Sequence, residues 1–202
     1  MQDPETPVTL RPLTAGDAAV AARLHEAGQP GTLLTSLGMS FLRTLYAGLA
    51  GAERSLGTVA VRNGRVVGVI AGTDDTARLF RDLLGRRWLQ IGLTACLGVL
   101  RRPSLVGMAW RAARYPAEAE HEEGVGELLF IGVDPQERRQ GIGAALLAEL
   151  VRASRARGLR DLFVTVDASN ATAIRFYERH GFVHLRTAEL YGRPMHFYRL
   201  QL

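Results

Sequence analysis

The segment from Glu127 to Arg157 constrains the fold more than any other part of the chain. It begins with a continuous apolar stretch that ends at Val133, as is typical of a buried strand. A charged loop with Arg138 and Arg139 follows, and Gly141-Ile-Gly143 then opens a long amphipathic helix. The first turn of a helix presents unpaired N–H groups and the positive end of the helix dipole. This order therefore predicts mixed α/β structure with a phosphate-binding turn before the helix.

The rest of the sequence predicts a single α+β domain over residues 1–202. Asn63-Gly64 lies between two β-rich runs and indicates a tight hairpin. No internal repeat or low-complexity linker separates the elements. Helices are expected over 18–27, 36–49, 141–157 and 170–179, and strands over 8–11, 58–62, 65–72, 127–133, 162–166, 182–186 and 195–200.

Basic residues number 25 against 20 acidic residues, and every basic residue is an arginine. The absence of lysine excludes Schiff-base catalysis and a P-loop, because both need a lysine amine. A net charge of +5 suits an anionic small molecule at least as well as a nucleic acid, so no nucleic-acid partner is expected. The single cysteine, Cys96, excludes an intramolecular disulfide and is expected to be buried in an apolar run.

No targeting or membrane-spanning segment is expected. The first ten residues lack the basic and apolar regions of a signal peptide. The longest apolar run, residues 88–100, would extend only about 20 Å as a helix, short of the roughly 30 Å of a bilayer core. We therefore expect no integral membrane span and a cytoplasmic location.

Residues from about 75 to 124 differ in composition from their surroundings and predict a helical insertion. Arginines recur along it, Pro103 is expected to split it into two helices, and an acidic loop over 118–123 ends it. His121 lies in this loop, but its spacing matches no metal motif, so no metal site is expected. The insertion either covers a bound acceptor, with arginines meeting a phosphate or carboxylate, or forms a dimerisation or membrane-surface element.

A dinucleotide-binding turn is the first alternative for the glycine-opened helix. Asp167 ends the next strand and is a candidate for a ribose contact. Leu146, however, stands where the third glycine of the dinucleotide motif belongs, and the charged loop is long where that motif turns tightly. The residues therefore disfavour binding of NAD.

Two blocks resemble a known family. Arg138-x-x-Gly141-x-Gly143 resembles the acetyl-CoA pyrophosphate signature of the GNAT N-acetyltransferase superfamily. The block from Asn170 to Phe182, with its Asn, Ala, Tyr and Gly-Phe, resembles the helix and turn that follow in that family. The resemblance spans roughly residues 127–182 and implies a mixed, mostly antiparallel sheet flanked by helices. It also implies acetyl-CoA as the acyl donor.

The resemblance implies a set of cofactor-binding residues. The pantetheine arm would pair with the main chain of Ile131, Gly132 and Val133. Asn170 matches a residue that contacts the cofactor, although an asparagine before a helix is also a normal N-cap. The pyrophosphate would lie against Arg138 and the backbone of Arg139, Gln140, Gly141, Ile142, Gly143 and Ala144.

Glu127 and Tyr177 are the candidate catalytic residues. Glu127 begins the strand that leads into the signature, where lysine-acetylating members of the superfamily have a catalytic glutamate; Asp74, Asp75 or water are the alternatives as base. Tyr177 matches the tyrosine near the thioester sulfur, or it packs in the core beside Phe176.

The expected function is transfer of an acetyl group to a primary amine of a small molecule by direct attack. The alternatives are acetylation of a protein N-terminus or lysine, or a non-catalytic acyl-CoA-binding module. A homodimer is compatible with the sequence.

Overall fold

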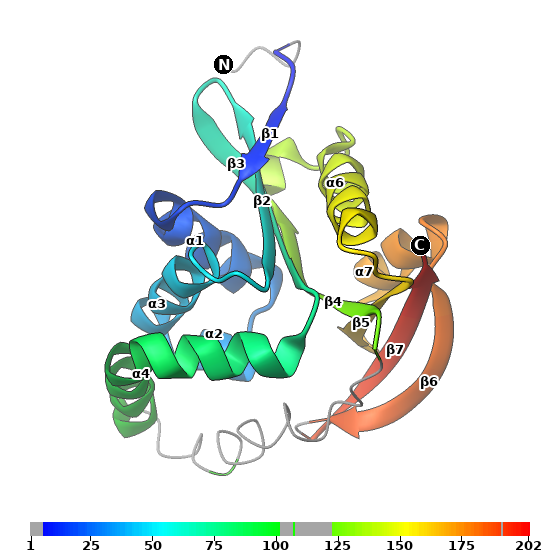
Figure 1. Cartoon of the computed structure of the whole chain (residues 1–202). Coiled ribbons are helices and arrows are strands. Elements are labelled where there is room, and N and C mark those ends of the chain that lie inside the picture. Colours follow the sequence, from blue (N-terminus) through cyan, green and yellow to red (C-terminus); the bar gives the residue numbers. More distant parts are fainter. Residues whose placement is uncertain (1–5, 102–106, 108–122, 191) are drawn as a thin grey trace.

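The computed structural model describes residues 6–101, 107, 123–190 and 192–202 of the chain. The described strands are β1 (Thr9–Pro12), β2 (Ser55–Arg62), β3 (Arg65–Thr73), β4 (Val125–Val133), β5 (Asp161–Asp167), β6 (Val183–Leu190) and β7 (Arg193–Gln201). They form a seven-stranded sheet in the order β1-β2-β3-β4-β5-β7-β6 (Figure 1). Adjacent strands are antiparallel except β4 and β5, which are parallel. The expected mixed, mostly antiparallel fold is confirmed.

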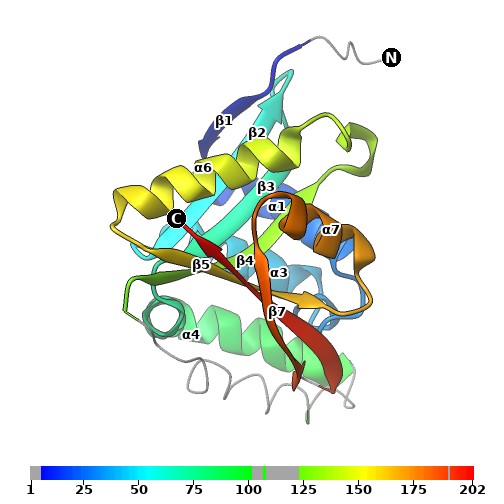
Figure 2. The same ribbon diagram turned by 90° about the vertical axis from the view of Figure 1, so that its right-hand side faces the viewer.

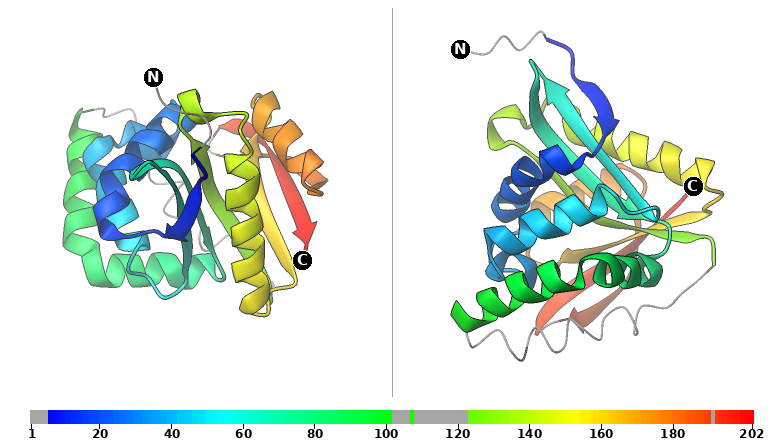
Figure 3. Two further views of the ribbon diagram at one scale, coloured as in Figure 1. Left: turned by 90° about the horizontal axis from the view of Figure 1, so that it is seen from above. Right: turned by 60° about the vertical axis from the view of Figure 1, so that its left-hand side comes forward.

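The described helices cover both faces of this sheet (Figures 2 and 3). One face carries α1 (Ala18–Gly28), α2 (Leu33–Ser36), α3 (Met39–Leu49) and α4 (Thr76–Arg101), and the other carries α6 (Ile142–Ala156) and α7 (Ala171–Arg179). Successive strand residues point to opposite faces, so they enter different cores. Val69 packs with the α1–α4 side, whereas its neighbour Ile70 packs with α6 and α7.

The β2–β3 hairpin forms at the expected turn. Asn63 and Gly64 have φ values of 49° and 71°, as a two-residue turn with both central residues in the left-handed region requires. The turn pairs Val61 with Val66, and a register shift between Ala60 and Val61 then brings Val59 opposite Val69.

The prediction of a single helix over 36–49 is wrong at its N-terminal end. The chain forms the short helix α2, which ends at Ser36, and starts α3 at Met39. Gly38, between them, has a φ of 96°, a conformation that favours glycine and cannot continue a helix. Thr32 caps α2 by accepting a hydrogen bond from the Thr35 backbone N–H.

The inserted block begins with the continuous helix α4. Its Leu79 and Leu83 are buried in the core on the α1–α3 side. A Cβ added to Gly98 would come within 2.5 Å of the Leu37 backbone oxygen, so this helix packs closely on the segment before α3. The expected break at Pro103 and the residues at 111–122, including His121, lie outside the described residues.

The expectation that Cys96 is buried in the apolar run is wrong, because its side chain is exposed. The reason is that α4 packs on the other described residues with one side only. Its other side carries exposed leucines: Leu89, Leu93, Leu97 and Leu100. None of the described helices is both long and apolar enough to cross a bilayer.

Candidate active site

Strands β4 and β5 separate halfway along their length. They pair from Val125 opposite Asp161 to Leu128 opposite Val164, and not beyond. Strand β4 nevertheless continues beside β3 to Val133, and β5 continues beside β7 to Asp167. An opening therefore lies between two strands in the middle of the sheet, flanked by a backbone edge that another extended chain can pair with.

A β-bulge occurs where the opening begins. Ala71 of β3 faces Phe130 of β4, but the next residue, Gly72, faces Leu128, so Leu129 is the extra residue. Such a residue bends the strand and re-aims the side chains that follow it. The predicted residues Ile131, Gly132 and Val133 lie beyond the bulge, on the stretch of β4 that no described strand pairs with on the β5 side.

The turn between β4 and α6 has the backbone of an anion site. A short 3-10 helix, η3 (Pro135–Glu137), leads to Arg139, whose φ is 64°, and Gly141, whose φ is 78°. Left-handed residues placed close together turn backbone N–H groups towards a common point. No side chain caps the N-terminus of α6, so its first amides remain available to a ligand.

The turn is fixed by a buried arginine that the sequence did not single out. The Arg62 guanidinium on β2 donates to Glu137 Oε2 and to Gln140 Oε1, each at 2.5 Å. The side chains of Arg62 and Glu137 are only 8% and 7% exposed. The Gln140 side chain is therefore engaged within the turn.

Arg138 and Arg139 are both exposed in the turn, and Arg138 contacts the end of β4. Its Nε donates to the Val133 carbonyl oxygen at 3.2 Å, which places the side chain across the end of β4. Gly143, in the first turn of α6, lies against α7: an added Cβ would be 3.4 Å from the Phe176 ring. The two segments that resemble the family are therefore in contact.

Helix α7 positions Asn170 and Tyr177. Asn170 is the N-cap: its Oδ1 accepts from the Ala173 backbone N–H at 3.1 Å. Tyr177 is 5% exposed and lies between Phe176 and Phe182, with ring centroids 5.5 and 5.3 Å away. Burial raises the pKa of the Tyr177 hydroxyl well above its usual value, so the group is protonated at neutral pH and carries a hydrogen that it can donate.

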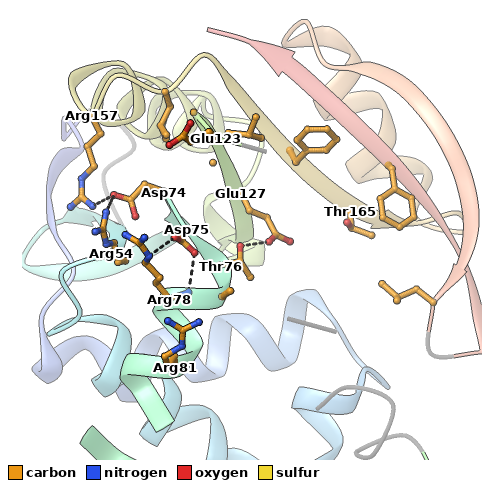
Figure 4. A pocket seen from close by; sticks show the side chains of 18 of the residues that line it. Arg54, Asp74, Asp75, Thr76, Arg78, Arg81, Glu123, Glu127, Arg157 and Thr165 are labelled. Carbon is orange, nitrogen blue, oxygen red and sulfur yellow. Dashed lines mark hydrogen bonds and ion pairs between the residues drawn. The ribbon is translucent and has the colours of Figure 1, made fainter. Parts of the chain in front are cut away.

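Glu127 lies on the opposite face of the sheet from Tyr177. Strand alternation directs its neighbour Leu128 into the α6–α7 core that contains Tyr177, and Glu127 to the other side. There its Oε2 accepts from Thr76 Oγ1, at the start of α4, at 2.5 Å (Figure 4). The two candidate catalytic residues thus lie on the two sides of the sheet that the β4–β5 opening connects.

The two alternative bases, Asp74 and Asp75, form ion pairs with arginines. Asp74 Oδ2 lies 3.5 Å from Arg54 Nη1 and 2.5 Å from Arg157 Nη1. Asp75 Oδ2 lies 3.2 Å from Arg78 Nε. Both alternative carboxylates are therefore engaged by arginine side chains.

A pocket of about 1020 Å³ opens on the Glu127 side of the sheet. Its floor is the sheet face that carries Glu127, Phe163, Thr165 and Phe197, which β4, β5 and β7 contribute in adjacent register. One wall is the first turns of α4, which supply polar side chains above the floor (Figure 4). The pocket is large enough for a small organic acceptor.

Asp167, the candidate for a ribose contact, is otherwise engaged. Its carboxylate accepts from the Ser169 backbone N–H at 2.8 Å and lies 2.7 Å from Arg193 Nη2. The structure therefore gives no support to the dinucleotide alternative.

Comparison with known proteins agrees with this architecture. The sequence profile of the acetyltransferase (GNAT) family matches residues 35–182, so the chain belongs to the GNAT family of acetyltransferases. A mycothiol acetyltransferase from Thermobispora bispora is 38% identical over 94 residues, which are 46% of this chain and 31% of that protein. The chain thus spans about a third of the length of this curated relative.

Solved structures share the fold over nearly the whole chain. A ribosomal-protein-alanine N-acetyltransferase from Brucella melitensis has a TM-score of 0.63 at 22% identity, and the match covers 96% of this chain and 99% of that one. A PaiA N-acetyltransferase from Thermoplasma acidophilum, solved in complex with coenzyme A, has a TM-score of 0.60 at 14% identity, with 97% and 99% covered.

Two residues of the site were missed by sequence reasoning. Arg62 ends β2 and meets Glu137 75 positions later, and Thr76 meets Glu127 51 positions later. Neither lies in a motif. Only the charge of Arg62 in an otherwise apolar strand could have drawn attention to it.

Proposed function

We propose that the protein is an acetyl-CoA-dependent N-acetyltransferase that acts on a primary amine of a small molecule. The observation that carries the proposal is the opening between β4 and β5, with Glu127 on one side of the sheet and Tyr177 on the other. The name of the mycothiol acetyltransferase relative supports a small-molecule acceptor.

Two segments of the chain are suited to binding acetyl-CoA, the acetyl donor. The uncapped turn from Arg139 to Ala144, with Arg138 beside it, would hold the pyrophosphate through backbone amides and charge. The unpaired edge formed by Ile131, Gly132 and Val133 would pair with the pantetheine arm. Asn170 would contribute at the start of α7, although its Oδ1 already caps that helix.

The proposed acetyl transfer uses one residue from each face of the sheet. When bound, the donor supplies an activated acetyl thioester. Glu127 takes a proton from the acceptor amine, which most amines carry at neutral pH. The amine nitrogen then forms a bond to the acetyl carbon as the carbon–sulfur bond breaks, and the nitrogen loses its second proton to solvent, from which Tyr177 regains the proton that it gives up. Tyr177, held protonated by burial, gives a proton to the departing sulfur. No covalent bond to the enzyme forms, so no nucleophilic side chain is needed.

The test begins with calorimetry of the purified protein with acetyl-CoA, coenzyme A and NAD. We expect micromolar binding of acetyl-CoA, about −8 kcal/mol, and no heat with NAD. If a folded sample does not bind acetyl-CoA, the assignment of the turn is wrong and the proposed function fails.

The second stage measures thiol release with a set of primary amines. Glu127→Gln is expected to lower kcat by about 100-fold or more while leaving acetyl-CoA affinity unchanged, as loss of a general base does. Glu26→Gln, at an exposed position on α1, is the matched control and should behave as wild type. Tyr177→Phe should also lower kcat; a loss of acetyl-CoA affinity without a loss of turnover would contradict its role as acid.

A further inference from the structure

The pocket beside Glu127 contains arginines of two kinds. Three of them form ion pairs: Arg54 and Arg157 share the carboxylate of Asp74, and Arg78 pairs with Asp75. The other two, Arg81 and Arg186, also line the pocket and form no ion pair with any described residue. Both side chains are exposed at the pocket, where a cation without a carboxylate partner attracts an anionic ligand.

Arg186 is held in place by an aromatic ring rather than by a carboxylate. Its guanidinium carbon lies 4.1 Å from the centroid of Phe197, its cross-strand partner. Stacking fixes the plane of the guanidinium and leaves its N–H edge available, which is the geometry that binds a carboxylate or phosphate in a bidentate manner. An arginine in this state loses little side-chain entropy when it binds an anion.

The register places Arg186 across the pocket floor from Glu127. Arg186 faces Phe197, Phe197 faces Thr165, and Thr165 lies two residues along β5 from Phe163, the partner of Glu127. With strands about 4.8 Å apart and a rise of about 3.3 Å per residue, the two Cα atoms are roughly 16 Å apart. Side chains stand roughly perpendicular to a sheet, so the charged groups of Arg186 and Glu127 are separated along the floor by a distance that a small organic molecule can span.

Arg81 lines the same pocket from the wall that α4 forms. It lies five residues after Thr76, the partner of Glu127, and so about 7.5 Å further along α4. Arg78, one turn before it on the same side of the helix, is paired with Asp75, whereas Arg81 is not (Figure 4). The α4 wall therefore presents Arg78, which is paired with a carboxylate, and one turn further along Arg81, which has no ion pair with a described residue.

We propose that the acceptor carries an anionic group, a carboxylate or a phosphate, in addition to the amine that is acetylated. Arg186 and Arg81 bind the anion while the amine faces Glu127. Glu123 and Glu189 also line the pocket without ion pairs to described residues, so the pocket suits a molecule with both charges better than a simple anion. This inference rests on the proposed function and specifies its acceptor.

The test compares amines that differ only in the anionic group. Glucosamine 1-phosphate is compared with glucosamine for the phosphate, and 4-aminobutyrate with butylamine for the carboxylate. Thiol release gives kcat/KM for each amine in wild type, Arg186→Gln, Arg81→Gln and Arg43→Gln. Arg43 is exposed on α3, outside the pocket, and serves as the matched control. The pair that shows a preference identifies the anionic group.

We expect the anionic member of one pair to be preferred about 10- to 100-fold, the range of a charged hydrogen-bonded contact. The preference should fall towards unity in Arg186→Gln and Arg81→Gln and persist in Arg43→Gln. Equal use of charged and neutral amines, or a preference that survives both substitutions, overturns the inference while leaving the acetyltransferase proposal intact. Absence of acetyl-CoA binding overturns both.

If acetyl-CoA binds but none of the four amines is acetylated, calorimetry decides. Glucosamine 1-phosphate and 4-aminobutyrate are titrated into protein saturated with coenzyme A. Binding that Arg186→Gln weakens about tenfold supports the anion site. Absence of heat with both compounds overturns it.

Discussion

His25 should make the stability of this protein depend on pH between its ordinary pKa of 6.5 and about 4. The side chain is 3% exposed on α1, and its Nδ1 lies 2.9 Å from the Tyr46 hydroxyl. Its ring stacks on Phe130 of β4, with centroids 4.5 Å apart. Burial lowers the pKa of His25 from 6.5 to about 4, because the apolar surroundings disfavour the imidazolium.

The sign of the effect follows from proton linkage. Between pH 6.5 and about 4 the unfolded chain binds a proton at His25 that the folded chain does not. The free energy of unfolding therefore falls as the pH is lowered through this window and is recovered as the pH rises. At about 1.4 kcal/mol for each pKa unit, the loss approaches about 3 kcal/mol. Asp17, whose pKa Arg11 lowers, adds a further loss only at more acidic pH.

The assay is urea unfolding followed by circular dichroism at pH values from 7 to about 4, with two-state extrapolation. His25→Gln should abolish most of the slope above pH 4.5, because the amide does not titrate. His184→Gln, at an exposed histidine on β6, should retain the wild-type slope. If wild type shows no decrease in this window, or His25→Gln decreases as steeply, the assignment of a buried neutral histidine is refuted.

Two further substitutions test how the site is held. Arg62→Met should lower the free energy of unfolding by about 3–5 kcal/mol and weaken acetyl-CoA binding in calorimetry, because Glu137 remains buried without its guanidinium. Partial recovery of stability by Glu137→Gln in the same chain would show that the unpaired charge is the cause; no recovery would contradict it. Thr76→Val should lower kcat by about tenfold with acetyl-CoA affinity unchanged, because Glu127 loses its hydroxyl donor. Thr76→Ser keeps the hydroxyl group and should restore kcat, and an equal loss in both variants would refute the positioning role.

The parts of this protein that the sequence determined by itself are local. The Asn63-Gly64 turn, the Asn170 cap and the glycine-opened start of α6 each depend on backbone conformation and hydrogen bonds within a few residues. Such features are specified by residue types at fixed short spacings, so they can be recognised without knowledge of the fold. The family resemblance rested on two of these segments, and they are in contact through Gly143 and Phe176.

Other features were decided only by tertiary structure. The exposure of Cys96 depends on which side of α4 packs on the core, and the amino-acid composition of an apolar helix does not reveal that side. The contacts of Arg62 with Glu137 and of Thr76 with Glu127 join residues distant in sequence, so they exist only after the sheet sets its register.

The pocket beside Glu127 also depends on tertiary structure. Its floor combines side chains from separate strands, and its wall comes from the inserted helix, so no single segment specifies its shape. The sequence identified a turn suited to an anion and a candidate base. Sheet pairing placed Glu127 and Tyr177 on opposite faces of one opening, because alternation along β4 and the end of its pairing with β5 fix where each side chain can lie.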